Sequence, residues 1–420
     1  MRGNNQRCIQ TETLPGWCWL EESGDQGSLI PALMLVMITT RPFSRSQFHF
    51  TSGRSRLLST KQRYYKMGKK KSAAIPEEAL ILPGYTPPPG TTVPAPPIVD
   101  THTHLISTFS QYRAKYPGGK YLTIHDFVRA FYPQKGGETS SVAITPNVAT
   151  LVDVYCEAPV LKEWKEVADS ALTLDQRAEL WGGVEYHFVI GVHPHNAKEY
   201  NDEVEQDLLE AAAHPRCVGM GEMGLDYHYD NSPRSVQREV LIRQLKCAVM
   251  LGKPLTIHTR EADEDILPIL KEHVPRDHHI HIHCFTDTPE LASSLLEHFP
   301  NLFIGITGVI TYATNINTTK VIQNMVANRM SKGVTLESKP PSLRILLETD
   351  APYMNPSNLP LQSFGMKPGT RLPFCHSGMI PWTAQYIAEA ATEASEGKMM
   401  WSTYDILQIG ADNARQMYNL

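Results

Sequence analysis

The chain has 420 residues, of which 41% are hydrophobic and 20% are charged, and its formal net charge is −5. This composition is typical of a globular protein and excludes a collagen-like or largely disordered chain. The modest negative charge argues against holding nucleic acid by bulk charge, although a local basic cleft is compatible with it. Seven scattered cysteines without a CxxC pair predict reduced thiols in a cytosol-like compartment, and neither a disulfide framework nor a structural zinc finger.

The N-terminal part carries no recognisable domain. Its apolar run SLIPALMLVMITT (28–40) is shorter than the roughly 20 residues that span a bilayer and lacks a preceding basic region. Residues 26–76 contain no acid and many Arg, Lys and Ser residues, which indicates either a mitochondrial presequence or an untranslated or disordered leader, with Met67 as an alternative start. We expect residues 1–97, including the Pro-rich spacer 84–97, to lie outside the fold. The expected location is cytoplasm or nucleus, or the mitochondrion if the leader is translated.

From residue 98 onward, short apolar runs alternate with helical stretches such as 235–252, whose apolar positions form one stripe. Strands separated by helices pair in parallel through βαβ units, and eight such units predict an α/β fold of the (β/α)₈ TIM-barrel type over residues 98–420. The absence of a Gly-rich phosphate loop after the first strand disfavours a doubly wound sheet. The predicted strands are 98–104, 149–155, 186–193, 217–222, 255–258, 279–284, 302–308 and 345–350.

One connection is much longer than the others. About forty residues, 106–148, separate the first two predicted strands. A loop of this length is usually functional or disordered, so we expect it to form a lid over the C-terminal ends of the strands. The same insert is a candidate surface for a protein partner.

Ligand-type side chains recur at the C-terminal ends of the predicted strands, where barrels of this type carry their active sites. His102 and His104 are two apart on one strand and therefore point to the same face. The full set predicts a site for two divalent ions, with Glu222 able to bridge them. Each residue alone has an ordinary explanation, as a satisfied core histidine or a helix cap, and His279 and His281 are interpreted as buried hydrogen-bonding residues. The predicted ligands are His102, His104, Glu222, His258, His283 and Asp350.

Five nearby residues are candidates for contact with a substrate. Arg260 shares a face with His258 and could hold a phosphate, unless it pairs with Glu261 or Asp263. The others follow the third and fourth strands, where turn residues are an equally good interpretation. The candidates are His193, His195, Tyr227, His228 and Arg260.

Taken together, the motifs resemble the TatD family of metal-dependent hydrolases, a branch of the amidohydrolase-like TIM barrels. The resemblance covers residues 98 to about 418. It implies the six ligands above, divalent-ion dependence and hydrolysis of DNA phosphodiester bonds. The chain departs from the family pattern at Leu105–Ile106, at Asp287 and at TRLPFCHSGMIP (370–381). The matching motifs are VDTHTHL, GVHPHNA, GEMGLDYHYD, KPLTIHTRE, HCFTD, LLETDAPYMNP and ADNARQMY.

These observations predict a deoxyribonuclease that uses metal-activated water, with Asp350 as the general base and Glu222 at the metal pair. The expected cofactors are two divalent ions, zinc, manganese or magnesium, and the expected partner is DNA or another phosphodiester. Two alternatives stay open. One is a small-molecule amide or ester hydrolase on the same metal site, and the other is a protein-interaction module that retains the hydrolase fold.

Overall fold

The computed structural model describes residues 75–82, 95–132, 147–331, 343–367 and 370–420. All described residues belong to one compact unit, which lies within Lys71–Leu420. The alternative start at Met67 and the basic leader up to residue 74 lie outside the described residues, as does most of the Pro-rich spacer.

Eight parallel strands form one sheet in chain order. The sheet closes between its first and last strands, where Thr103 bridges Ala351 and the Asp350 amide donates to the His102 carbonyl at 2.9 Å. This closure confirms the predicted (β/α)₈ barrel. The strands are β1 (Ile98–Thr103), β2 (Val148–Tyr155), β3 (Glu185–Ile190), β4 (Cys217–Asp226), β5 (Leu255–Arg260), β6 (Ile280–Ile282), β7 (Leu302–Ile306) and β8 (Ile345–Leu347).

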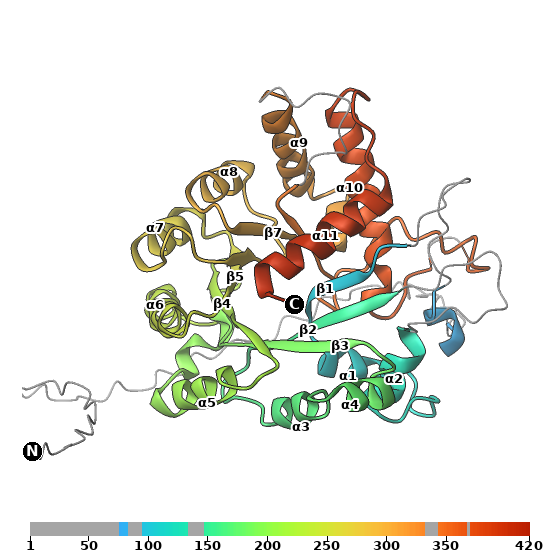
Figure 1. The fold of residues 1–420 in the computed structure, drawn as a ribbon, viewed down its shortest axis with the longest axis horizontal. Coiled ribbons are helices and arrows are strands. Elements are labelled where there is room, and N and C mark those ends of the chain that lie inside the picture. Colours follow the sequence, from blue (N-terminus) through green and yellow to red (C-terminus); the bar gives the residue numbers. More distant parts are fainter. Residues whose placement is uncertain (1–74, 83–94, 133–146, 332–342, 368–369) are drawn as a thin grey trace, which may run out of the picture. The chain divides into compact units, whose positions relative to one another are not determined.

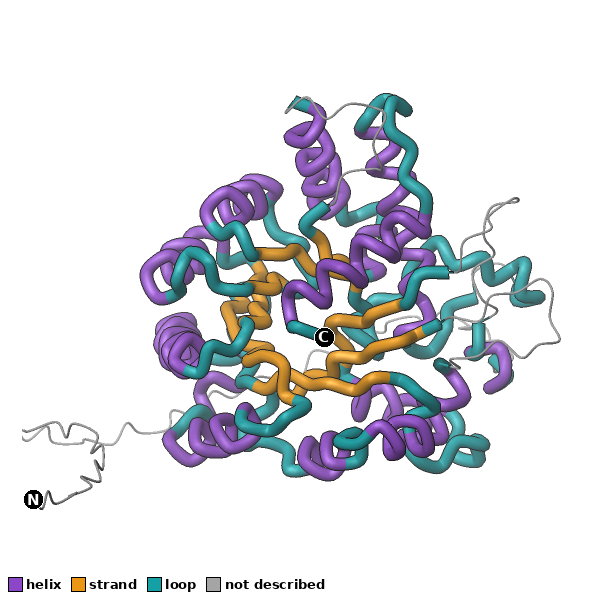
Figure 2. Tube along the Cα trace, in the orientation of Figure 1, coloured by secondary structure: helices purple, strands orange, loops and turns teal. Residues whose placement is uncertain are grey.

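Helices surround the strands on the outside (Figure 2). Several begin at reciprocal capping boxes that the sequence encodes, for example Thr123 with Asp126 and Ser402 with Asp405. The α-helices are α1 (Leu105–Lys115), α2 (Ile124–Phe131), α3 (Glu163–Asp169), α4 (Leu174–Leu180), α5 (Asp202–Ala212), α6 (Arg234–Met250), α7 (Asp263–His273), α8 (Pro289–His298), α9 (Ile316–Met330), α10 (Ile380–Ala394) and α11 (Thr403–Tyr418). Short 3₁₀ turns are η1 (Glu77–Leu80), η2 (Pro194–Glu199), η3 (Gly308–Thr311) and η4 (Ser377–Met379).

The inside of the barrel is a packed apolar core. Strand side chains such as Val152, Phe303 and Leu346 meet there with Met417 and Tyr418 of α11. Helix α11 contacts β1 and β8 and crosses the sheet next to the C-terminus (Figure 1). Because the strands are buried on both faces, their sequences are continuous apolar runs. The polar residues that interrupt these runs therefore need a specific reason to be there.

The described part of the 106–148 insert differs from the expected lid. Residues 105–115 and 124–131 are the helices α1 and α2, and Tyr112, Phe127 and Phe131 are fully buried in the core. The prediction of a long loop is therefore wrong for residues 106–132, because their aromatic residues provide enough apolar surface to pack, and a position over the strand ends stays a prediction. Residues 133–146 lie outside the described residues, and the role of the insert as a partner surface stays a prediction.

A second correction concerns residues 75–82, which were expected outside the fold. Leu80 and Leu82 are buried in the main core, and the Leu80 carbonyl accepts a hydrogen bond from His376 Nε2 at 3.0 Å. The Tyr116 hydroxyl donates to the Ile75 carbonyl at 2.9 Å. This short segment is therefore part of the folded domain. His376 belongs to 370–381, the stretch that departs from the family pattern. This stretch therefore helps to hold residues 75–82 against the domain.

Two composition-based expectations can be examined over the described residues. None of the described helices is both long and apolar enough to cross a membrane. The described cysteines, five in number, are all free thiols, as expected.

Candidate metal centre

The six predicted ligands converge at the C-terminal ends of the strands. One ligand atom from each member of a group lies within 4.8 Å of the others, in three overlapping groups. The groups are His102, His104 and Asp350; His102, Glu222 and His283; and His193, Glu222 and His258. Because these residues come from β1, β4, β5 and the ends of β3, β6 and β8, only the closed barrel brings them together.

Glu222 is at the centre of the arrangement, and its two carboxylate oxygens face different histidines. Its Oε2 lies 3.4 Å from His102 Nε2 and 3.8 Å from His104 Nε2. Its Oε1 lies 2.7 Å from His258 Nδ1 and 2.9 Å from His283 Nε2. A carboxylate placed in this way can bridge two cations, each held by its own set of imidazoles.

Asp350 completes the first set of ligands. Its Oδ1 lies 3.4 Å from His104 Nε2 and 3.8 Å from His102 Nε2. The His102 ring stacks on the His283 ring with centroids 3.8 Å apart. The two sets of imidazoles therefore adjoin each other across the barrel axis, with carboxylate oxygens between them.

The side chains fit a divalent cation. His102 is fully buried, and neither of its ring nitrogens has a hydrogen-bond partner. Burial lowers the pKa of His102 to about 4, so the ring is neutral, which is the form that binds metals. Burial raises the pKa of Glu222, but the surrounding imidazoles, His283 and His193 foremost, outweigh it and hold that pKa well below its ordinary value. An ionised carboxylate surrounded by imidazole nitrogens is a strong donor set for a cation.

The backbone is strained at two of these strand ends. Asp350 has φ 51° and Cys284, next to His283, has φ 42°. Residues other than glycine seldom adopt this left-handed conformation, and its cost is tolerated mainly at functional sites. Strands β6 and β8 end at Ile282 and Leu347, earlier than predicted, and Cys284 and Asp350 lie in the segments that follow.

His193 lies inside the cluster although it was interpreted as a substrate contact. Its Nε2 is 3.3 Å from Glu222 Oε1, and its ring centroid is 4.6 Å from that of His258. Burial lowers the pKa of His193 to about 4. The sequence contained the signal, since His193 closes the apolar run of the third strand as His258 closes that of the fifth.

The other four predicted substrate residues lie outside the three ligand groups, and three of them have hydrogen-bond partners. His195 Nε2 lies 2.9 Å from Asp226 Oδ2, and His228 Nδ1 lies 2.6 Å from Glu261 Oε1. The hydroxyl of the buried Tyr227 donates to Asp265 at 2.5 Å, which turns it toward α7. Arg260 has no ion-pair partner within the described ranges, so the alternative of a salt bridge to Glu261 or Asp263 is not observed; its guanidinium lies 4.9 Å from the Tyr229 ring centroid.

Two buried carboxylates outside the predicted site residues contact histidines of the barrel. Asp226 Oδ2 lies 3.4 Å from His258 Nε2, and Glu348 Oε2 lies 2.7 Å from His281 Nε2. His281 is fully buried as predicted, whereas His279 is only half-buried. Strand alternation contained a signal for Glu348, because residue 348 shares a face with Asp350.

Asp287, where the chain departs from the family pattern, also has a structural explanation. Its carboxylate accepts hydrogen bonds from the Thr259 hydroxyl at 2.8 Å and the Glu261 amide at 2.9 Å. These bonds fix the turn that follows β5, and Glu261 within that turn has φ 54°. The side chain thus supports the strand that carries His258.

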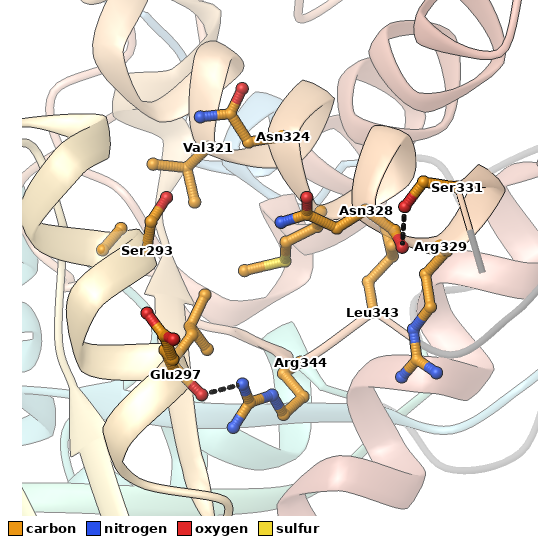
Figure 3. Close-up of a pocket in the computed structure, with 12 residues that line it drawn as sticks. Ser293, Glu297, Val321, Asn324, Asn328, Arg329, Ser331, Leu343 and Arg344 are labelled. Carbon is orange, nitrogen blue, oxygen red and sulfur yellow. Dashed lines mark hydrogen bonds between the residues drawn. The ribbon is translucent and has the colours of Figure 1, made fainter.

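A cavity of about 620 Å³ lies elsewhere, between α8 and α9 (Figure 3). It is lined by Glu297, Asn324, Asn328 and Arg344, among others, and contains none of the predicted site residues. Arg344 stands just before the start of β8, at the opposite end of the barrel, and donates to the backbone carbonyls of Phe299 and Pro300. The cavity is therefore separate from the ligand cluster.

Comparison with known proteins agrees with this geometry. The family model described as TatD related DNase matches residues 99–419, which is most of the chain. The chain belongs to this family. Within the TatD family, it is 35% identical over 263 residues to a human protein named 3'-5' RNA nuclease TATDN2. That match covers 62% of this chain and 29% of the human protein.

Two bacterial TatD-related proteins align over more of their own length. A protein of Erwinia tasmaniensis named 3'-5' ssDNA/RNA exonuclease TatD is 36% identical over 170 residues, covering 40% of this chain and 59% of that protein. The uncharacterized metal-dependent hydrolase YabD of Bacillus subtilis is 29% identical over 239 residues, covering 56% and 80%.

Solved structures share the fold. A TatD family hydrolase from Entamoeba histolytica superposes with a TM-score of 0.53 at 16% identity, covering 78% of this chain and 99% of the other. The TatD homologue YJJV from Escherichia coli superposes with a TM-score of 0.51 at 21% identity, covering 77% and 98%.

Proposed function

We propose that this chain is a metal-dependent nuclease that hydrolyses phosphodiester bonds in single-stranded nucleic acid. One observation carries the proposal: Glu222 offers one oxygen to the His102–His104 pair and the other to His258 and His283. Family membership and the names of the relatives support the same chemistry. Sites with two adjacent cations commonly hydrolyse phosphate esters.

The proposed cofactors are two divalent ions that share Glu222. His102, His104 and Asp350 would hold one ion, and His258, His283 and His193 would hold the other. This set is rich in imidazole, which favours zinc or manganese over magnesium. When bound, such ions acidify a water molecule and stabilise negative charge on a phosphoryl oxygen.

The carboxylates of the chain have separate roles in this proposal. Asp350 accepts the proton of the attacking water, because its carboxylate is at the mouth and retains 12% exposure, whereas Glu222 is 3% exposed. Glu222 stays ionised and keeps the two sets of imidazoles in register. Arg260, with no acidic partner in the described chain, supplies positive charge near the scissile phosphate.

The rim offers surfaces that suit unpaired bases. Tyr229 is 56% exposed with Arg260 against its ring, and Tyr353 is 52% exposed with its ring centroid 6.4 Å from that of His104. Exposed aromatic rings next to a cation are the features with which proteins hold single-stranded nucleic acid. An enzyme for small amides or esters has no evident need for two such rings.

The test is cleavage of labelled single-stranded DNA, single-stranded RNA and duplex DNA by the metal-loaded full chain. We expect single strands to be cut, and EDTA to abolish cleavage. Asp350→Ala and His102→Ala should lose activity by roughly 100-fold or more. The control is Asp277→Asn, an exposed carboxylate before β6 at the other end of the barrel, which should cleave like the wild type.

Three results would contradict the proposal. Cleavage that resists EDTA, or that persists in both variants, would exclude the metal mechanism. Bound metal without any nucleic-acid cleavage, together with hydrolysis of small esters or amides, would favour the alternative hydrolase. Bound metal with no hydrolysis at all would favour an interaction module.

A further inference from the structure

Two ionisable groups that are not ligands lie buried inside the barrel, beneath the metal centre. Glu348 and His281 are both 0% exposed. Burying ionisable groups in an apolar core is costly unless they are paired. Neither group can reach a substrate, so their presence calls for a role toward neighbouring side chains.

Glu348 contacts the chain next to His283 through its carboxylate. Its Oε1 accepts the amide hydrogen of Cys284 at 2.5 Å and lies 3.7 Å from His283 Nδ1. The opposite ring nitrogen, His283 Nε2, lies 2.9 Å from Glu222 Oε1. Glu348 is thus on the side of the imidazole that faces away from the cluster, and it also holds the backbone at Cys284, where φ is 42°.

The other carboxylate oxygen of Glu348 faces His281. Its Oε2 approaches His281 Nε2 to 2.7 Å, and His281 Nδ1 bonds the Tyr418 hydroxyl at 2.8 Å. The ring nitrogen and the oxygen are close but are not aligned as a hydrogen bond. Tyr418 also bonds Thr256 Oγ1 at 2.7 Å. A polar chain therefore runs from α11 at the floor of the barrel up to the metal centre.

The neighbouring strand makes room for this chain. Gly305 is at the middle of β7, in an otherwise apolar run, and a Cβ at this position would overlap His281 Nε2 and Glu348 Oε1. A glycine inside a strand commonly marks the close approach of another group. A glycine thus replaces an apolar core side chain where Glu348 and His281 need the space. This is a second observation, independent of their contacts, that the fold accommodates these two residues.

We propose that Glu348 is a positioning residue that aims His283 Nε2 at the metal centre, and that His281 and Tyr418 hold Glu348 in place. The 3.7 Å separation of Glu348 Oε1 from His283 Nδ1 is an electrostatic contact and not a hydrogen bond, and a carboxylate on this side of the ring favours a hydrogen on Nδ1 and leaves the Nε2 lone pair for a cation. The inference rests on the proposed function, since it takes His283 to be a ligand.

The test measures metal affinity directly. Mn²⁺ is titrated against a competing chelator into the wild-type full chain, Glu348→Gln and Tyr418→Phe, and folding is checked by circular dichroism. Glu348→Gln keeps the volume and an acceptor for the Cys284 amide but removes the charge, so we expect the Mn²⁺ affinity to fall about 10- to 100-fold. Tyr418→Phe removes only a hydroxyl and should cause a smaller fall in the same direction. Raising the Mn²⁺ concentration should restore cleavage by Glu348→Gln.

The matched control is Asn413→Ala, another buried polar residue of α11. Its side chain donates to the carbonyls of Leu343 and Ile345 and contacts no imidazole. This variant should lose stability but keep the wild-type Mn²⁺ affinity. An equal loss of affinity in Asn413→Ala would show that general destabilisation, and not positioning, is responsible.

Failure of the inference is distinguishable from failure of the proposed function. Suppose that the wild type binds Mn²⁺ and that His283→Ala weakens this binding. If neither Glu348→Gln nor Tyr418→Phe weakens it, the positioning role is overturned while the proposed nuclease function stands. If the wild type binds no divalent ion, both are overturned. If Glu348→Gln does not fold, Tyr418→Phe alone decides the outcome by the same measurement.

Discussion

At the residue scale, the proposed chemistry depends on Glu222, since each of its oxygens faces a different set of imidazoles. Its surroundings hold its pKa well below the ordinary value, and two residues at the neighbouring strand ends, Asp350 and Cys284, have a left-handed backbone conformation. The residues at the rim are less constrained. There the substrate is expected to decide which side chains matter.

Tyr353→Ala is expected to weaken the binding of single-stranded nucleic acid. Stacking of a base on an aromatic ring contributes about 1–3 kcal/mol, so KM should rise by roughly 5- to 100-fold while kcat changes less. Steady-state kinetics on a labelled oligonucleotide measure both. Tyr353→Phe keeps the ring and should behave like the wild type; an equal loss in Phe and Ala would show that the hydroxyl, not stacking, is responsible.

The candidate ligands were predictable from the sequence because strand ends in a parallel barrel share one mouth. His193 was predicted to contact substrate and the structure places it among the candidate ligands, so its role as a substrate contact stays a prediction. Glu348 was missed altogether. Its position in LLETD indicates that it shares a face with Asp350. The local sequence does not indicate that His281 and Gly305 lie next to it in the barrel.

At the scale of elements, the predicted strands and the long helix at 235–252 correspond closely to the structure, where that helix is α6 (Arg234–Met250). Apolar periodicity identifies such elements because both faces of a parallel strand are buried. The wrong predictions concern segments whose local sequence pattern does not indicate a helix or a packed turn. The helices of the 105–132 segment and the docking of η1 depend on contacts with distant residues such as Phe374 and His376.

The docking of η1 predicts a measurable contribution to stability. Leu80→Ala removes a side chain that is 0% exposed and should lower the free energy of unfolding by about 2–5 kcal/mol. Urea denaturation followed by tryptophan fluorescence measures the change. Leu122→Ala, at a leucine that is 67% exposed, is the matched control and should change it by less than about 0.5 kcal/mol. Similar values for the two variants would mean that η1 does not contribute to the core.

At the scale of the whole molecule, the buried His376 is expected to contribute a stability that is lost in mild acid. Burial, the first cause, lowers the pKa of His376 from 6.5 to about 4, so the unfolded chain takes up a proton at a higher pH than the folded chain does. The contribution is therefore complete above pH 6.5 and is lost as the pH falls from 6.5 toward 4. Its maximum is about 3 kcal/mol.

Urea unfolding of the wild type and His376→Gln at pH 7.5, 6 and 5 tests this dependence. The variant lacks the titrating ring, so the stability difference between the two proteins should shrink as the pH is lowered. A difference that stays constant from pH 7.5 to pH 5 would contradict a neutral, buried His376. Other buried histidines titrate in both proteins and cancel in the difference.

The seating of Leu80 and Leu82 bears on how the enzyme should be produced. The range matched by the family begins at residue 99. Truncating the chain to that range would remove Leu80 and Leu82 and expose the apolar surface that they cover beside His376. Such a fragment would tend to aggregate during purification even if its metal centre were intact. Expression from Met67 retains both leucines and is the more practical starting point for biochemistry.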